Sequence, residues 1–85
     1  MSEGQIISCQ LHDYIEIACL YGYSIELQLT DRGRLQGRAK TTQTSTDRKE
    51  WLVLDQAGEE IKVELAQIRR LSALTRNPHF DVVDF

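Results

Sequence analysis

The sequence has few of the residues that build covalent or metal-bound frameworks. Its 85 residues include only two cysteines, two histidines, one proline and one tryptophan. Two cysteines, Cys9 and Cys19, are too few for a disulfide scaffold, and we expect both to be reduced. Because the chain has no Cys-x-x-Cys pair and no histidine cluster, it predicts no zinc site. We expect a protein that works without a metal or another cofactor.

Long apolar runs are also missing. No segment approaches the ~20 apolar residues that a membrane-spanning helix needs. The first residues, MSEGQIISCQL, lack the basic start and apolar core of a signal peptide. We therefore expect a cytoplasmic protein without a membrane partner. A chain that is 41% hydrophobic and 27% charged is typical of a folded protein, and its length predicts a single domain over residues 1–85.

Basic residues are absent from the first 31 positions, which hold five acids. The next stretch, residues 32–49, reverses this balance, with six Lys or Arg residues against Asp47 alone. Residues 50–68 are acidic again, with five acids against Lys62. Charge arranged in such blocks predicts an acidic pole and a basic patch, which steer partners of opposite charge.

One short helix is predicted near the N-terminus, from about Asp13 to Tyr21, after a loose lead-in over residues 1–8. The pair Asp13-x-x-Glu16 fits a capping box at the start of this helix. Gly22 follows where a left-handed residue commonly ends a helix. Ile15, Ala18 and Cys19 share one face, which must pack against the rest of the chain because a helix of about two turns is unstable alone.

Strand patterns fill the remainder of the chain. Apolar residues alternate with polar ones over much of it, and turn residues separate the segments. Residues 34–42 would turn Leu35, Gly37, Ala39 and Thr41 inward, with a sharp bend or close approach at Gly37. The expected strands are 24–30, 34–42, 50–55, 60–65, 68–74 and a terminal edge strand at 80–85, with a turn at 31–33 and an exposed loop at 43–49. The predicted fold is α+β and mostly β: a short helix followed by a strongly bent, five- to six-stranded antiparallel sheet or partly open barrel.

Catalysis has little support in the sequence. His12 adjoins Asp13, but neighbours in sequence do not form a proton relay, and a surface or capping role is simpler. Ser8 and Cys9 have no glycine elbow and no partner base. Burial explains Cys19 better than reactivity does, whereas the role of Cys9 stays open. We expect a protein that is not an enzyme, with a cysteine-based redox role as a minor alternative.

Two binding surfaces remain as candidates. The first is the basic segment 32–49, where Arg34, Arg38 and Lys40 share the outer face of one strand near Arg48 and Lys49. That row could follow an RNA backbone, or it could be a solvated strand face, and no aromatic residue lies within it to stack on bases. Trp51, the nearest aromatic residue, is predicted to be in the core.

The second candidate is the acidic first third of the chain. Its acids and tyrosines, without compensating bases, could dock on a basic protein. Helix capping explains Asp13 and Glu16 equally well, so residue chemistry leaves this choice open.

Three segments together resemble a known family. The helix segment CQLHDYIEIACLYGY, the hairpin LQLTDRGRLQGRA and the next strand, with Trp51, are similar to the Rof family of Rho-binding antiterminators, also called YaeO. The resemblance runs from about Ile7 to Phe85. Its most specific part is the helix motif, with matching Cys9, Asp13, Glu16, Ala18 and Cys19. The hairpin is also similar to the first motif of Sm-like proteins, in which a glycine bends the second strand.

The resemblance implies an Sm-like fold, no enzyme activity and a bacterial cytoplasmic location. It implies a monomer that binds the transcription termination factor Rho at its RNA-capturing N-terminal region and so inhibits termination, without direct nucleic-acid binding. An Sm-like RNA-binding module that uses segment 32–49 is the alternative. The residues that the resemblance assigns to Rho binding are His12, Asp13, Tyr14, Glu16, Arg48 and Lys49.

Overall fold

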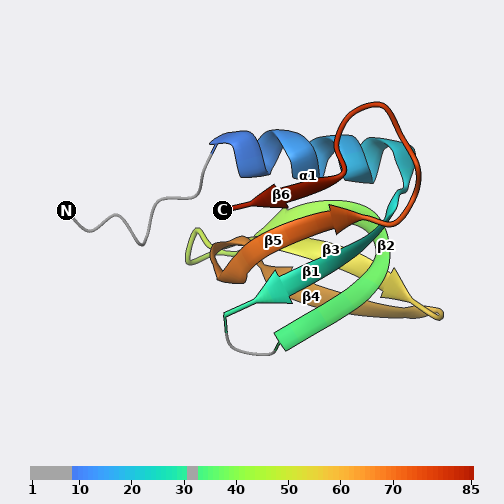
Figure 1. Ribbon diagram of the computed structural model, residues 1–85. Coiled ribbons are helices and arrows are strands. Elements are labelled where there is room, and N and C mark those ends of the chain that lie inside the picture. Colours follow the sequence, from blue (N-terminus) through green and yellow to red (C-terminus); the bar gives the residue numbers. More distant parts are fainter. Residues whose placement is uncertain (1–8, 31–32) are drawn as a thin grey trace.

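The computed structural model describes residues 9–30 and 33–85 of the chain (Figure 1). One α-helix, α1 (Cys9–Tyr21), precedes an antiparallel sheet whose strand order is β4-β3-β2-β1-β5-β6. The strands are β1 (Ser24–Leu29), β2 (Gly33–Thr44), β3 (Glu50–Gln56), β4 (Glu59–Glu64), β5 (Ile68–Ala73) and β6 (Val82–Asp84). A 3-10 helix, η2 (Leu65–Gln67), links β4 to β5. In the described residues β4 and β6 are the sheet edges, so the predicted open, mostly β fold is confirmed.

Strand β2 is the longest strand and produces the bend of the sheet. Its first half pairs with β1 and its second half pairs with β3, so it belongs to both arms of the curve. A Cβ atom on Gly37 would lie 3.0 Å from the Cβ of Leu54 and 3.2 Å from the carbonyl oxygen of Asp55. Only glycine permits this close approach without a shift, which confirms the prediction made for Gly37. The pairing shifts between Ala39 and Thr41, where Lys40 is the extra residue of a β-bulge.

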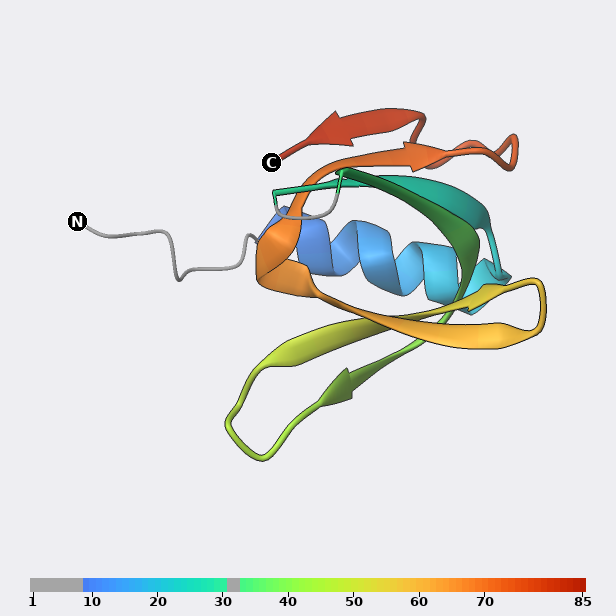
Figure 2. The ribbon, with the colours of Figure 1, turned by 90° about the horizontal axis from the view of Figure 1, so that it is seen from below.

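Helix α1 lies above the curved sheet in Figure 1, and Figure 2, seen from below, shows it behind the opening between the strands. Leu11, Ile15 and Ala18 from one helix face are at most 3% exposed and join the core. Strand β3 contributes three consecutive buried residues, so it is covered on both faces as its continuous apolar run predicts. The remaining core residues come mainly from alternate positions of β1 and from isolated buried positions of β4 and β5.

The predicted start of the helix is wrong. In the described residues helix α1 begins at Cys9, four residues before Asp13, and its first turn contains no acidic residue. Asp13 and Glu16 therefore lie within the helix, and they do not form a capping box. The described helix is 13 residues long, which at 3.6 residues per turn is more than three turns. The predicted end is confirmed, because Gly22 adopts a left-handed φ of 66° directly after Tyr21.

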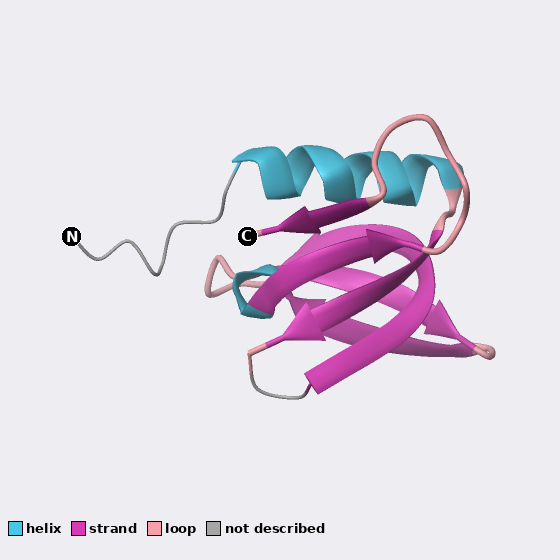
Figure 3. Cartoon of the chain, in the orientation of Figure 1, coloured by secondary structure: helices cyan, strands magenta, loops and turns pink. Residues whose placement is uncertain are grey.

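Two details of the sheet also differ from the prediction. Thr41 is exposed, because the bulge at Lys40 reverses the alternation that would have turned it inward. Gln43 and Thr44 belong to β2, so the predicted loop begins only at Ser45 (Figure 3). The loose lead-in over 1–8 and part of the turn at 31–33 lie outside the described residues.

Candidate partner-binding surface

Two carboxylates stand on the outer face of α1. Asp13 and Glu16 are both exposed, and their spacing of three residues places them side by side on the helix surface. The helix contains no Lys or Arg. Within residues 9–30 and 33–85, neither carboxylate forms an ion pair or a side-chain hydrogen bond. The structure thus presents two free negative charges in one place.

The neighbours of Asp13 lie on the two flanks of the helix. His12 is half-buried, and its Nε2 lies 2.7 Å from Oε1 of Glu50 at the start of β3, without the direction of a regular hydrogen bond. Tyr14 is also half-buried and packs edge-on against Phe80, with ring centres 5.2 Å apart. The sequence grouped both residues with the acids, but the structure gives each of them a contact that fixes the helix to another element.

The turn between β2 and β3 holds the two predicted basic contacts, Arg48 and Lys49. Ser45 N donates to the carbonyl of Lys49 and Arg48 N donates to the carbonyl of Ser45, both at 2.9 Å. Arg48 takes a left-handed φ of 67°, the conformation that follows a type I turn in a short hairpin loop. Both side chains are exposed, and neither has an ion pair with another described residue. The turn is compact, and it directs two cations into solvent.

A chain of side-chain hydrogen bonds supports this turn. The Asp47 carboxylate accepts from the Ser45 hydroxyl, and this hydrogen bond lowers the pKa of Asp47 below its usual value. The Ser45 hydroxyl oxygen accepts in turn from Nε1 of Trp51 at 3.2 Å. Trp51 is only half-buried, so its predicted place in the core is wrong. Its indole N–H needs a partner, and sequence reasoning missed that Ser45 supplies one.

The basic row along β2 is exposed, but its charges have partners on neighbouring strands. Lys40 Nζ lies 2.7 Å from a carboxylate oxygen of Glu60 on β4. This contact raises the pKa of Lys40 and lowers the pKa of Glu60. The Arg38 guanidinium packs over Gly22, 3.1 Å from where a Cβ atom would stand, at the negative end of the helix dipole. The row is therefore partly engaged by the fold itself.

The described residues offer little for other chemistries. Burial raises the pKa of the Cys19 thiol to about 11, so the reactive thiolate is scarce at neutral pH. No group of three His, Cys, Asp or Glu side chains within 9–30 and 33–85 is placed to hold a metal ion. Over the same residues, no helix combines the length and the apolar character needed to cross a membrane.

Comparison with known proteins gives a family and several solved structures. The family described as "Modulator of Rho-dependent transcription termination (ROF)" matches residues 6–85. The structure described as "YaeO bound to Magnesium from Vibrio cholerae O395" is 33% identical, with a TM-score of 0.79 over 86% of this chain and 95% of that chain. A comparison with curated proteins gives no match.

The match covers almost the whole chain, and the solved structure has the same fold, as the resemblance in the sequence predicted. The family is one of modulators of Rho-dependent transcription termination, and its description implies Rho as the partner. The chain belongs to the Rof family of modulators of Rho-dependent transcription termination.

Proposed function

We propose that this protein inhibits Rho-dependent termination by docking the outer face of α1 on the RNA-capturing N-terminal region of Rho. Asp13 and Glu16 would contact basic groups that otherwise hold RNA phosphates. A carboxylate makes charge-assisted hydrogen bonds with the same guanidinium and ammonium groups that a phosphate engages. Binding of the two ligands to Rho would then be mutually exclusive.

The observation that carries this proposal is that the fold does not use the two acids. Both lie inside α1 rather than at its start, so helix capping no longer explains them. Asp is also a poor residue for a helix interior, where it costs a few tenths of a kcal/mol relative to Ala. Two free acids retained at some cost to the helix are better explained by a partner than by stability.

The basic turn can take part in the same contact. His12 and Glu50 join the N-terminal half of α1 to the base of the β2–β3 hairpin, because Glu50 is the first residue of β3. Arg48 and Lys49 immediately precede Glu50, and the hairpin extends away from the rest of the sheet in Figure 2. We assign these cations a secondary role at the rim, where exposed charges act mainly on association rate and orientation.

Direct RNA binding through the β2 row is the less favoured function. Lys40 is already paired with Glu60, and Arg38 packs over Gly22 beside the helix end. The described part of β2 also has no aromatic side chain that could stack on a base. Lys40 has to leave Glu60 before it can contact a phosphate.

Displacement of labelled RNA from intact Rho tests the proposal. We expect the protein to form a complex with Rho at low salt, to lower RNA occupancy, and to lose affinity steeply as salt rises. The double variant Asp13→Lys, Glu16→Lys should raise the half-maximal concentration at least about 100-fold, because like charges would then face each other. Its circular dichroism and thermal unfolding should show that the fold is kept.

A matched control is the double variant Glu59→Lys, Glu64→Lys on the edge strand β4. It makes the same change in net charge, and neither residue forms an ion pair in the described part of the chain. We expect it to displace RNA nearly as well as the unmodified protein. The proposal fails if no complex forms with Rho, or if the two double variants lose activity equally.

A further inference from the structure

Leu20 is the most exposed large apolar side chain in the described part of the chain. It is 74% exposed, although it lies within α1, where neighbouring residues pack on the sheet. It is absent from the hydrophobic core and from the layer packed against that core. Tyr21, the next residue, is also exposed but stacks on Tyr23 and His79, with ring centres 5.6 Å and 5.3 Å away. Leu20 has no comparable packing against any described residue, so the described fold does not account for it.

The position of Leu20 places it in line with the two free acids. Glu16 precedes it by four residues and Asp13 by seven, which are the spacings of one helix face. At 1.5 Å per residue, this line is about 10 Å long. The exposed fractions agree, because Leu11, Ile15 and Ala18 occupy the opposite face and are buried. The outer face of α1 thus carries charge at one end and an apolar side chain at the other.

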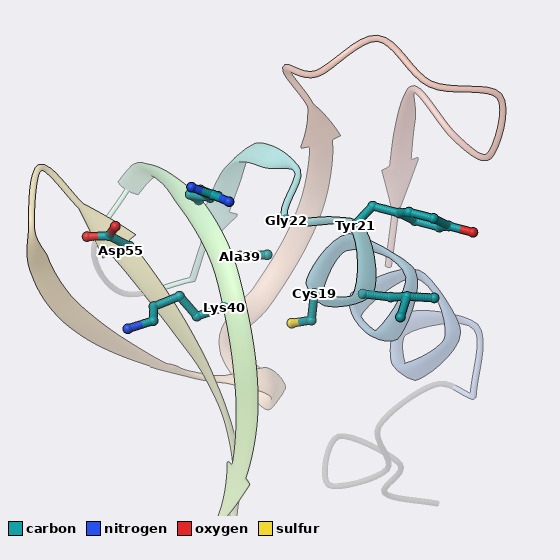
Figure 4. Close-up of a pocket in the computed structure, with 8 residues that line it drawn as sticks. Cys19, Tyr21, Gly22, Ala39, Lys40 and Asp55 are labelled. Atoms are coloured by element: carbon teal, nitrogen blue, oxygen red, sulfur yellow. The ribbon is translucent and has the colours of Figure 1, made fainter.

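A hollow adjoins the apolar end of this line. It has a volume of about 420 Å³ and is lined by Leu20 together with residues of β2 and β3. In Figure 4 the Cys19 side chain points from the helix toward β2, while Tyr21 points away from the hollow. Lys40 and Asp55 lie across from the helix on the strand side. Leu20 therefore stands at a rim, with space beside it for a partner's surface.

We propose that Leu20 is the apolar anchor of the Rho-binding surface. The facing surface of Rho would then have a basic patch opposite Asp13 and Glu16 and an apolar site opposite Leu20, about one and a half helical turns further along α1. The inference rests on the function proposed above. Exposed charges mainly set the association rate and its salt dependence, whereas buried apolar anchors set how slowly a complex dissociates. The acids would direct the encounter with Rho, and Leu20 would hold the complex together.

The test compares the association and dissociation kinetics of variants with intact Rho. Leu20→Ala should weaken binding about 10- to 100-fold, mostly through faster dissociation. The slope of affinity against salt should stay unchanged, because no charge is altered. Asp13→Asn combined with Glu16→Gln should instead lower that slope and slow association. Leu20→Met, which keeps an apolar side chain of similar volume, should restore most of the affinity.

Leu74→Ala is the matched control, because Leu74 is 50% exposed and lies in the loop after β5. It should bind Rho like the unmodified protein. Leu20→Ala should not lower thermal stability, since the side chain is outside the core and Ala favours helix. The anchor role is refuted if Leu20→Ala binds within twofold of the unmodified protein, or if Leu74→Ala is weakened equally. If the unmodified protein does not bind Rho, the proposed function fails instead.

Discussion

Two charged regions of this protein have the opposite relation to its fold. The acids on the outer face of α1 have no partner among the described residues, whereas two of the bases along β2, Arg38 and Lys40, contact neighbouring elements. The sequence showed both regions as similar blocks of one sign. The difference arises because the outer face of α1 has only solvent beside it, whereas the side chains of a central strand lie beside those of neighbouring strands, which can supply opposite charges. A block of charge therefore indicates a binding surface only where the fold leaves it free.

The variant with the largest expected effect on stability tests the contact between Arg38 and the end of α1. Gly22→Ala puts a Cβ atom at a φ of 66° and within 3.1 Å of the Arg38 guanidinium. We expect it to lower the free energy of unfolding by about 1–2 kcal/mol for the left-handed conformation alone, and by a small further amount because the end of the Arg38 side chain must shift by a few tenths of an ångström. Urea unfolding at neutral pH measures this loss.

The hairpin residue Gly58 provides the control for that variant. It also has a positive φ, of 91°, but a Cβ atom there would meet nothing within 4 Å. Gly58→Ala should show the cost of backbone strain without the steric term, so it should destabilise less than Gly22→Ala. Equal losses would contradict the claim that Arg38 is held beside the helix end.

We expect a smaller effect, on RNA affinity, from removing the ion pair between Lys40 and Glu60. Glu60→Gln removes the carboxylate that lies 2.7 Å from Lys40 Nζ and leaves the ammonium group free for a phosphate. We expect the affinity for single-stranded RNA at low salt to rise a few-fold, as one added phosphate contact would give. Binding to Rho should stay unchanged. Fluorescence titration with labelled RNA measures the first quantity.

Glu59→Gln is the matched change, since it alters net charge equally and Glu59 has no ion pair in the described residues. An equal rise in RNA affinity for both variants would show that general charge, and not the release of Lys40, controls RNA binding. An unmodified protein that binds RNA strongly would overturn the comparison between α1 and β2 itself.

Most helices and strands of this fold could be predicted from the sequence, because each depends on a pattern of neighbouring residues. Alternating apolar residues predicted the strands, and Gly22 marked the end of the helix. The start of the helix was not readable, because Asp13-x-x-Glu16 fits a capping box and two outward positions inside a helix equally well. The bulge at Lys40 was also hidden, since it depends on how β2 pairs with β3. That bulge is why Thr41 is exposed.

The sequence predicted which charged residues belong to the candidate site, but it did not predict which residues they contact. The acids were found from composition and from the family resemblance. The partners of His12, Tyr14 and Lys40 lie 38 residues, 66 residues and 20 residues further along the chain, on Glu50, Phe80 and Glu60. Such pairs follow from strand order and from helix placement, which no local pattern specifies. Leu20 had a local signal, because it lies seven residues after Asp13, but its exposure depends on which helix face meets the sheet.

Cross-saturation NMR of the labelled protein bound to intact Rho tests the central claim most directly, because saturation passes only to amides close to the partner. We predict the strongest transfer to the outward positions of α1 between Asp13 and Leu20, with weaker transfer to the turn at Arg48 and Lys49. The exposed residues Arg34 and Gln36 of β2, which do not line the hollow beside Leu20, should remain unaffected. Transfer concentrated on that stretch of β2, with none on the helix, would contradict the account.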